Sequence, residues 1–213
     1  ILNSPKNIEM RIKRLGDFFL SLLLLIISSP IVLVSIFIIY IQDSGPIFYS
    51  QLRTGKNGKV FKITKLRTMK VNAEIKGPQW SKKNDPRITK FGYFLRKLRI
   101  DELPQLISVL KGEMSLIGPR PERPEIDEIL EKEIPNYKLR YLIRPGLSGW
   151  AQVNYPYGSS IDDASQKLSY DLYYLNNYNN FIDFIILFKT MRLIFNGNGS
   201  LPRNLTKDDQ DML

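Results

Sequence analysis

Hydrophobic residues follow one another without a single charged residue over residues 18–41, a run of 24 positions near the start of the chain. A helix of that length is long enough to cross a bilayer, whereas the apolar part of a signal peptide is shorter and precedes a small-residue cleavage site. Ser28, Ser29 and Pro30 interrupt the run near its middle. Because proline removes a backbone donor and disturbs a helix, we predict a break at Ser29 and Pro30.

Basic residues flank this apolar run on both sides. Arg11, Lys13 and Arg14 precede it, and Arg53 and Lys56 are the first of several that follow it. Lysine and arginine prefer the cytoplasmic face of a membrane, so a straight spanning helix would leave one basic flank on the wrong side. We therefore favour a re-entrant helix hairpin over a kinked spanning helix. A buried helix of a soluble protein is a weaker alternative, because so long an uncharged run is unusual there.

The periodicity after the apolar run predicts a small β-hairpin followed by helices. Residues 47–49 and 60–63 have the composition of two strands on either side of a turn at 55–58. Thr89 is a candidate N-cap for a helix that reaches about residue 99. Further segments with helical spacing are expected at about 103–110, 121–133 (acidic and solvent-facing) and 184–195.

The fold class that we predict is α+β, mostly helical, in a monotopic membrane protein. Residues 1–45 would form the membrane anchor, 46–196 a cytosolic catalytic domain, and 197–213 a flexible tail, while 70–86 would be a loop. The segments at 89–99 and 184–195 combine apolar stripes with basic residues, which is typical of helices that lie at a membrane surface. Ordinary helices packed on a core would show similar stripes, so both interpretations stay open.

The chain has no histidine and no cysteine. This excludes a disulfide framework, a Cys/His zinc site, a thiol nucleophile and an imidazole base. Any chemistry must use carboxylates, hydroxyls, lysine, arginine, tyrosine or a metal held by oxygen, and oxygen ligands favour a hard cation such as Mg²⁺.

The net charge of +10 is concentrated in one half of the chain. The first 100 residues hold 19 of the 31 Lys and Arg but only 5 of the 21 Asp and Glu. A basic half indicates anionic partners, namely phosphate substrates, an acidic membrane face or nucleic acid. The long apolar run argues against nucleic acid.

Two adjacent carboxylates, Asp101 and Glu102, lie where a basic helix is expected to end and an apolar-striped helix to begin. An aspartate at such a junction is a natural N-cap, which is the simpler interpretation. The functional interpretation is that one carboxylate attacks phosphorus while its neighbour helps to hold Mg²⁺. Neighbouring arginine and lysine side chains would then keep the nucleophile ionised.

Basic residues that could bind phosphate occur before and after this pair. Arg120 lies between Pro119 and Pro121, whose stiff backbone would present its guanidinium for two-pronged phosphate contact. Lys65 and Arg67 form a second basic pair in the sequence. Taken alone, Arg120 could equally be an exposed residue of a surface turn.

Seven segments in order resemble one family, the bacterial polyprenyl-phosphate sugar-1-phosphate transferases, or monotopic phosphoglycosyl transferases of the exopolysaccharide-initiating type. Each segment is modest alone, but their order and spacing are specific. The segments are the apolar run with Ser29-Pro30, then 61–69, 85–89, 101–105, 111–121, 144–150 and 170–174.

The resemblance implies a reaction in which Asp101 attacks the β-phosphate of a UDP-sugar and UMP leaves. The sugar phosphate then passes to undecaprenyl phosphate, as the first membrane step of exopolysaccharide or glycan biosynthesis. It also implies that Glu102 helps to place Mg²⁺, that Arg120 binds substrate phosphate, and that Lys65 and Arg67 lie near the site. The implied location is the bacterial inner (cytoplasmic) membrane, surrounded by membrane lipids, with the active site on the cytoplasmic face.

Several points stay open at this level. The sugar is undetermined, with a weak preference for a simple hexose over N-acetylated or deoxy relatives. A homo-oligomer is compatible with the sequence, and larger members of the family carry an upstream membrane region that could precede this chain too. The main alternative function is a non-enzymatic, basic membrane-surface module that binds anionic lipid.

Overall fold

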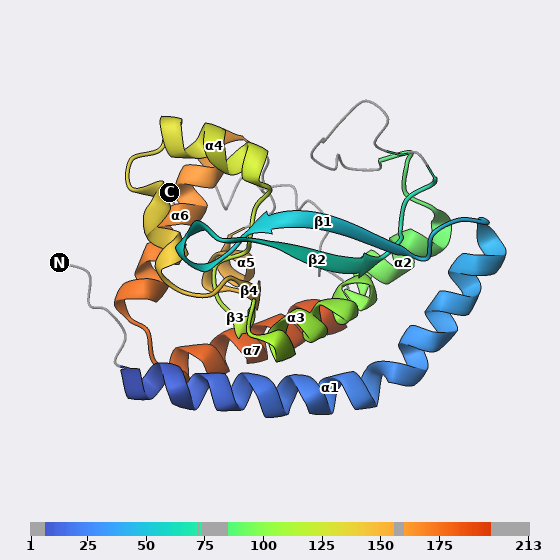
Figure 1. Cartoon of the computed structure of the whole chain (residues 1–213), viewed down its shortest axis with the longest axis horizontal. Helices are drawn as coiled ribbons and strands as arrows, with labels where there is room; N and C mark the ends of the chain where they lie inside the picture. The colour runs from blue at the N-terminus through green and yellow to red at the C-terminus, as the bar shows by residue number, and fades with distance from the viewer. Residues whose placement is uncertain (1–6, 72, 74–84, 156–159, 197–213) are drawn as a thin grey trace.

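The computed structural model describes residues 7–71, 73, 85–155 and 160–196. Figure 1 shows a long helix, α1, beneath a body of shorter helices that surround two small sheets. The predicted tail at 197–213 and most of the predicted loop at 70–86 lie outside the described residues. The elements are α1 (Asn7–Gln42), β1 (Phe48–Thr54), η1 (Lys56–Gly58), β2 (Val60–Leu66), α2 (Lys90–Lys97), η2 (Ile100–Gln105), α3 (Leu106–Lys111), β3 (Ser115–Ile117), α4 (Pro124–Glu133), η3 (Tyr137–Leu142), β4 (Gly146–Ser148), α5 (Trp150–Asn154), α6 (Ile161–Asn176) and α7 (Asn180–Phe195).

The predicted β-hairpin is confirmed, and a second sheet accompanies it. β1 and β2 pair antiparallel, with Phe48 opposite Leu66 and Thr54 opposite Val60. β3 and β4 pair in parallel, although each has only three residues, too few for the sequence pattern to reveal. A Cβ on Gly146 would lie 2.1 Å from the backbone nitrogen of Gly118, so this close pairing requires a glycine.

The helix α1 is long and apolar enough, by its length and composition, to cross a bilayer, and little of its apolar stretch is buried against the rest of the protein. The helix continues through Pro30, and Figure 1 shows its axis bending between its two halves. The hydroxyl of Ser29 donates to the carbonyl of Ile26 at 2.8 Å. The helix therefore bends in this region without ending, and the re-entrant hairpin stays a prediction.

Both halves of α1 contact the same body. In the first half, Lys13 pairs with Asp183 of α7 at 2.6 Å, and Asp17 accepts a hydrogen bond from Ser115 of β3 at 2.7 Å. Arg14 donates to two carbonyls at the C-terminal end of α3. In the second half, buried Ile39 packs in one cluster with side chains of β2 and α2. These contacts fix α1 to the body at both ends.

The helices at 89–99 and 184–195 form close to their predicted places. Thr89 caps α2 by accepting from the backbone nitrogen of Gly92, as expected. The predicted apolar stripe on α7 is largely exposed, since Phe184 and Phe188 are each 65% exposed while Ile186 is fully buried. The apolar side chains of α7 thus do not form a simple core stripe, which agrees better with a helix at a membrane surface.

The acidic helix begins later than predicted and is not wholly solvent-facing. α4 starts at Pro124, because proline suits the first helical position. Asp127 and Leu130 of α4 are buried, and Asp127 accepts a hydrogen bond from the hydroxyl of Tyr137 at 2.9 Å. The sequence of this acidic helix does not show that one of its carboxylates, Asp127, is buried against a tyrosine.

Candidate active site

The two candidate carboxylates lie in the 3₁₀ turn η2, between α2 and α3. Arg99 adopts a left-handed backbone (φ 56°) and is the N-cap of this turn, with no side-chain cap bond. Asp101 and Glu102 follow inside the turn and are only 6% and 5% exposed. The prediction of Asp101 as an N-cap is therefore wrong, because the left-handed residue starts the turn two positions earlier.

Three basic side chains converge on the carboxylate of Glu102. Its Oε1 accepts from Lys65 Nζ at 2.6 Å and from Arg120 Nη2 at 2.5 Å. Its Oε2 accepts from Arg99 Nη1 at 3.3 Å and from Arg120 Nη1 at 3.5 Å. The cations come from β2, from the start of η2 and from the loop after β3, so folding brings together residues 55 positions apart in the sequence. Charge-assisted bonds of this kind are among the stronger hydrogen bonds in proteins.

The two carboxylates have opposite electrostatic surroundings. Burial, followed by the charge of Glu102, raises the pKa of Asp101 above its ordinary value, against the smaller effect of Lys65, Arg96 and Arg99. Burial also raises the pKa of Glu102, but Arg120, Lys65 and Arg99 outweigh it and hold this pKa well below the usual range. The neighbouring cations do favour the ionised form of Asp101, as expected, but burial and the charge of Glu102 outweigh them, so the pKa of Asp101 is raised overall.

Arg67 bonds to Asp43 rather than to the two carboxylates. Its Nη2 donates to the backbone carbonyl of Asp43, just after α1, and lies 3.7 Å from the Asp43 carboxylate. The other terminal nitrogen, Nη1, is buried without a hydrogen-bond partner. Arg67 thus connects β2 to the end of α1, and its role in phosphate binding stays a prediction.

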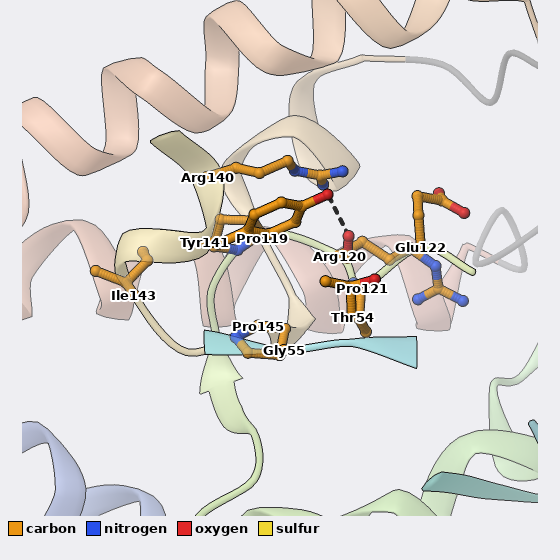
Figure 2. Close-up of a pocket in the computed structure, with 10 residues that line it drawn as sticks. All are labelled: Thr54, Gly55, Pro119, Arg120, Pro121, Glu122, Arg140, Tyr141, Ile143 and Pro145. Carbon is orange, nitrogen blue, oxygen red and sulfur yellow. Dashed lines mark hydrogen bonds between the residues drawn. The ribbon is translucent and has the colours of Figure 1, made fainter. Parts of the chain in front are cut away.

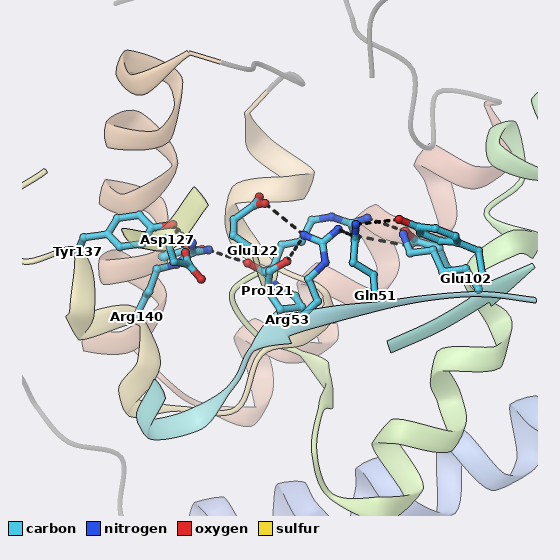
Figure 3. A network of polar contacts seen from close by, with 12 residues as sticks. Gln51, Arg53, Glu102, Pro121, Glu122, Asp127, Tyr137 and Arg140 are labelled. Carbon is cyan, nitrogen blue, oxygen red and sulfur yellow. Dashed lines mark hydrogen bonds and ion pairs between the residues drawn. The ribbon is translucent and has the colours of Figure 1, made fainter. Parts of the chain in front are cut away.

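Arg53 and Arg140 hold the loop that carries Arg120, as Figure 3 shows. Arg53 Nη1 donates to the carbonyl of Pro121 at 3.0 Å and lies 3.3 Å from a carboxylate oxygen of Glu122. Arg140 Nη2 donates to the carbonyl of Arg120 itself at 2.8 Å. The partly buried Arg53 and the buried Arg140 therefore fix the backbone from which the Arg120 side chain reaches Glu102.

Arg140 is itself held by buried partners. It pairs with Asp171 of α6 at 3.0 Å and donates to the hydroxyl of Tyr137, over whose ring it lies at 5.0 Å. Burial raises the pKa of Asp171 to about 6, although Arg140 opposes that shift. Sequence reasoning missed Arg53 and Arg140, because isolated arginines carry no signal. Asp171 lies in one of the segments that indicate the family, but nothing there assigned it a role.

A pocket lies beside the backbone of Arg120 and is drawn in Figure 2. Its lining includes Arg120 but neither Asp101 nor Glu102, so it is not the space around the carboxylates. The full lining is Thr54, Gly55, Pro119, Arg120, Pro121, Glu122, Arg140, Tyr141, Ile143 and Pro145.

The residues present fit a magnesium ion only together with a phosphate substrate. Within the described residues, no group of three or more Asp, Glu, His or Cys side chains could hold a metal. Mg²⁺ is commonly held by one or two carboxylates, with waters and substrate phosphates completing its octahedron. Asp101 and Glu102 can supply such a pair, but both oxygens of Glu102 already contact basic side chains.

Comparisons with known proteins agree on one family. Residues 8–197 match the family described as bacterial sugar transferase. The chain is 42% identical over 196 residues to a UDP-N-acetylgalactosamine-undecaprenyl-phosphate N-acetylgalactosaminephosphotransferase of Aeromonas hydrophila, covering 92% of this chain and 46% of the relative. It is 50% identical over 131 residues to a putative undecaprenyl-phosphate N-acetylgalactosaminyl 1-phosphate transferase of Bacillus subtilis, covering 62% of this chain and 73% of the relative.

A third relative is a UDP-glucose:undecaprenyl-phosphate glucose-1-phosphate transferase of Escherichia coli, 37% identical over 187 residues, which cover 87% of this chain and 40% of the relative. The chain thus spans less than half of the length of the Aeromonas and Escherichia relatives. The match nevertheless covers almost all described residues, including the turn with the two carboxylates and the loop with Arg120. The chain belongs to the bacterial sugar transferase family.

Proposed function

We propose that this chain is a phosphoglycosyl transferase, which moves a sugar-1-phosphate from a UDP-sugar to undecaprenyl phosphate and releases UMP. The observation that carries the proposal is that buried Asp101 is adjacent to Glu102, on whose carboxylate three basic side chains gather. Cations beside a carboxylate suit a reaction between a carboxylate and a diphosphate, whose negative charges would otherwise repel each other. The family assignment supports the same reaction.

In the proposed first step, an Asp101 oxygen attacks the β-phosphorus of the UDP-sugar. The bond from that phosphorus to the bridging oxygen breaks, UMP leaves with the electron pair, and an aspartyl-phosphosugar remains. In the second step, a phosphate oxygen of the lipid attacks the same phosphorus and releases the Asp101 carboxylate. Lys65, Arg99 and Arg120 would stabilise the charge that develops on the phosphate oxygens.

Magnesium is part of this proposal, with Asp101 and Glu102 as its candidate ligands. The ion would neutralise phosphate charge when it is bound with the substrate. Arg53 and Arg140 would hold the Arg120 side chain in place for the substrate, because they donate to the backbone carbonyls of Pro121 and Arg120.

The membrane arrangement that we propose is monotopic, with α1 re-entering on the cytoplasmic face. Two features support it: both halves of α1 contact the same body, and both flanks of the apolar run are basic. Exposed phenylalanines of α7 would lie against the lipid beside it. The bacterial inner membrane is the location that the lipid substrate implies.

Cysteine labelling tests this topology, and the chain has no cysteine of its own to interfere. Single cysteines replacing Asn3 and Ser44 are expected to resist a membrane-impermeant maleimide in intact spheroplasts and to react after lysis. Labelling of either position in intact spheroplasts would reject the re-entrant arrangement in favour of a spanning helix.

UMP release tests the proposed reaction. Detergent-purified protein is incubated with Mg²⁺, undecaprenyl phosphate and a panel of UDP-sugars. UDP-N-acetylgalactosamine is tested first, because relatives at 42% and 50% identity are named for that sugar. UMP from one donor, dependent on the lipid for repeated turnover, is the expected result. No UMP from any donor, with folded protein, would favour the non-enzymatic membrane-surface module instead.

A further inference from the structure

The two parts of the candidate site belong to one short stretch of chain. The turn η2, with Glu102, runs directly into α3, and β3 follows α3 after a left-handed Gly112 (φ 84°). The loop with Arg120 leaves the end of β3. The position of β3 beside α3 therefore limits how closely the Arg120 guanidinium approaches the Glu102 carboxylate, a distance of 2.5 Å in this structure.

Two charged residues in the first half of α1 hold this stretch, and Figure 1 shows α1 running beneath α3 and β3. Arg14 donates to two backbone carbonyls at the C-terminal end of α3, at 2.6 and 2.7 Å. Asp17 uses both carboxylate oxygens on β3. One oxygen accepts from the hydroxyl of Ser115 at 2.7 Å, and the other accepts from the backbone nitrogen of Leu116 at 3.2 Å. One helix thus holds both α3 and β3.

The bonds of Asp17 lie in a buried joint. Asp17 is 6% exposed and Ser115 is 1% exposed, so water competes little for these bonds. Attachment of α1 would not by itself require them, because apolar contacts could attach the helix without burying a carboxylate. Hydrogen bonds are directional, so this joint also fixes how β3 is oriented on α1.

The residues that follow β3 carry this orientation to the Arg120 loop, because they are bound to β4 and its neighbours. The backbone nitrogen of Gly118 donates to the carbonyl of Ser148 at 2.8 Å. The carbonyl of Pro119 accepts from the backbone nitrogen of Gly146 at 2.8 Å. A shift of β3 on α1 would therefore move the backbone from which the Arg120 side chain extends.

We propose that Asp17 is a positioning residue for the transfer reaction, and that it places the Arg120 guanidinium beside Glu102 through β3. This inference rests on the proposed function and gives the membrane helix a part in the reaction besides anchoring the chain. Loss of the Asp17 bonds then slows the reaction of each folded molecule. A residue that only anchors the helix would instead change the amount of folded protein.

A burst of UMP release separates these two roles. Detergent-purified protein is mixed rapidly with Mg²⁺ and a saturating amount of the active UDP-sugar, without lipid, and the first UMP formed per chain is followed over time. The size of the burst counts the working molecules, and its rate constant gives the speed of each. Asp17→Leu replaces the carboxylate by an apolar group of similar shape. We expect its rate constant to fall by at least about tenfold, because a displacement of about 1 Å can cost about 10²-fold.

Two further variants identify the cause. Asp17→Asn is expected to stay within about threefold of the wild-type rate constant, since its amide can accept from Leu116 and donate to Ser115. Asp183→Leu is the matched control, which makes the same chemical change where α7 pairs with Lys13 of α1 at 2.6 Å, and its rate constant should equal that of the wild type. An unchanged rate constant for Asp17→Leu with only a smaller burst would overturn the inference, and so would equal falls for Asp17→Leu and Asp183→Leu.

Arg120→Lys gives a second readout, because it keeps the charge but lacks the guanidinium fork. If Asp17 acts through Arg120, Asp17→Leu slows the Arg120→Lys protein much less than it slows the wild type. Equal slowing in both proteins would contradict the inference. Should Asp17→Leu not fold, Ser115→Ala breaks the same contact from β3 and is read in the same way.

The wild type separates the two possible failures. A folded wild type that gives no burst with any UDP-sugar would contradict the proposed function itself. A wild-type burst whose rate constant is unchanged in Asp17→Leu would contradict only the role assigned to Asp17.

Discussion

Asp101→Asn is expected to lower the rate of UMP release by about 10⁴-fold or more, because it removes the proposed nucleophile and leaves only substrate binding and the surrounding cations. The amide has almost the same shape as the carboxylate, so the turn η2 can keep its geometry. Burial raises the pKa of Asp101, which means that its ionised form destabilises the folded state at neutral pH. Asparagine removes that charge, and we expect the variant to unfold at the same or a higher temperature than the wild type.

The matched control for this prediction is Asp162→Asn, at an exposed position in the first turn of α6. Its UMP release is expected to equal that of the wild type. Residual turnover of Asp101→Asn within about tenfold of the wild type would contradict the assignment of Asp101 as nucleophile. A variant that is inactive and also unfolded would be replaced by Asp101→Ser, with circular dichroism and thermal melting measured beside the assay.

Arg140→Met is expected to destabilise the fold by about 3–5 kcal/mol, because it leaves the carboxylate of Asp171 buried without its cation. Asp171 is 2% exposed, so water cannot replace the lost partner. The hydroxyl of Tyr137 and the carbonyl of Arg120 lose a donor at the same time. For a chain of this length the expected fall in the thermal midpoint is roughly 10 °C.

Lys138→Met is the matched control for Arg140→Met. Lys138 lies two positions away in η3, pairs with Glu131 at 3.3 Å, and has a side chain that is 75% exposed. An exposed pair of this kind contributes less than about 1 kcal/mol. The double change Arg140→Met with Asp171→Leu should recover part of the lost stability, since it removes both charges of the buried pair. Equal melting shifts for Arg140→Met and Lys138→Met would contradict the structural role of Arg140.

The elements with strong local signals were predictable from the sequence. The 24-residue apolar run indicated α1, alternation around a glycine turn indicated β1 and β2, and Thr89 marked the start of α2. The parallel pair β3 and β4 was not predictable, because three-residue strands depend on partners that lie far apart in the sequence.

The candidate site was predictable in its residues and less so in its contacts. The order of motifs pointed to Asp101, Glu102, Arg120 and Lys65, and the structure brings the last three together at Glu102. Because Asp101 and Glu102 are adjacent in the sequence, the sequence could not show which of the two carboxylates would bind the basic side chains. The convergence depends on the left-handed backbone of Arg99 and on the loop that Arg140 holds, both of which are set by tertiary packing.

The measurement that tests the central claim most directly is the intact mass of the protein after incubation with Mg²⁺ and the active UDP-sugar donor, without polyprenyl phosphate. The account predicts one UMP released per chain and an increase in mass equal to one sugar phosphate, with the added group on Asp101 and absent from Asp101→Asn. Adding undecaprenyl phosphate should then remove the group and start repeated turnover. UMP that forms only when the lipid is present, with no added mass on the protein at any time, would contradict the account.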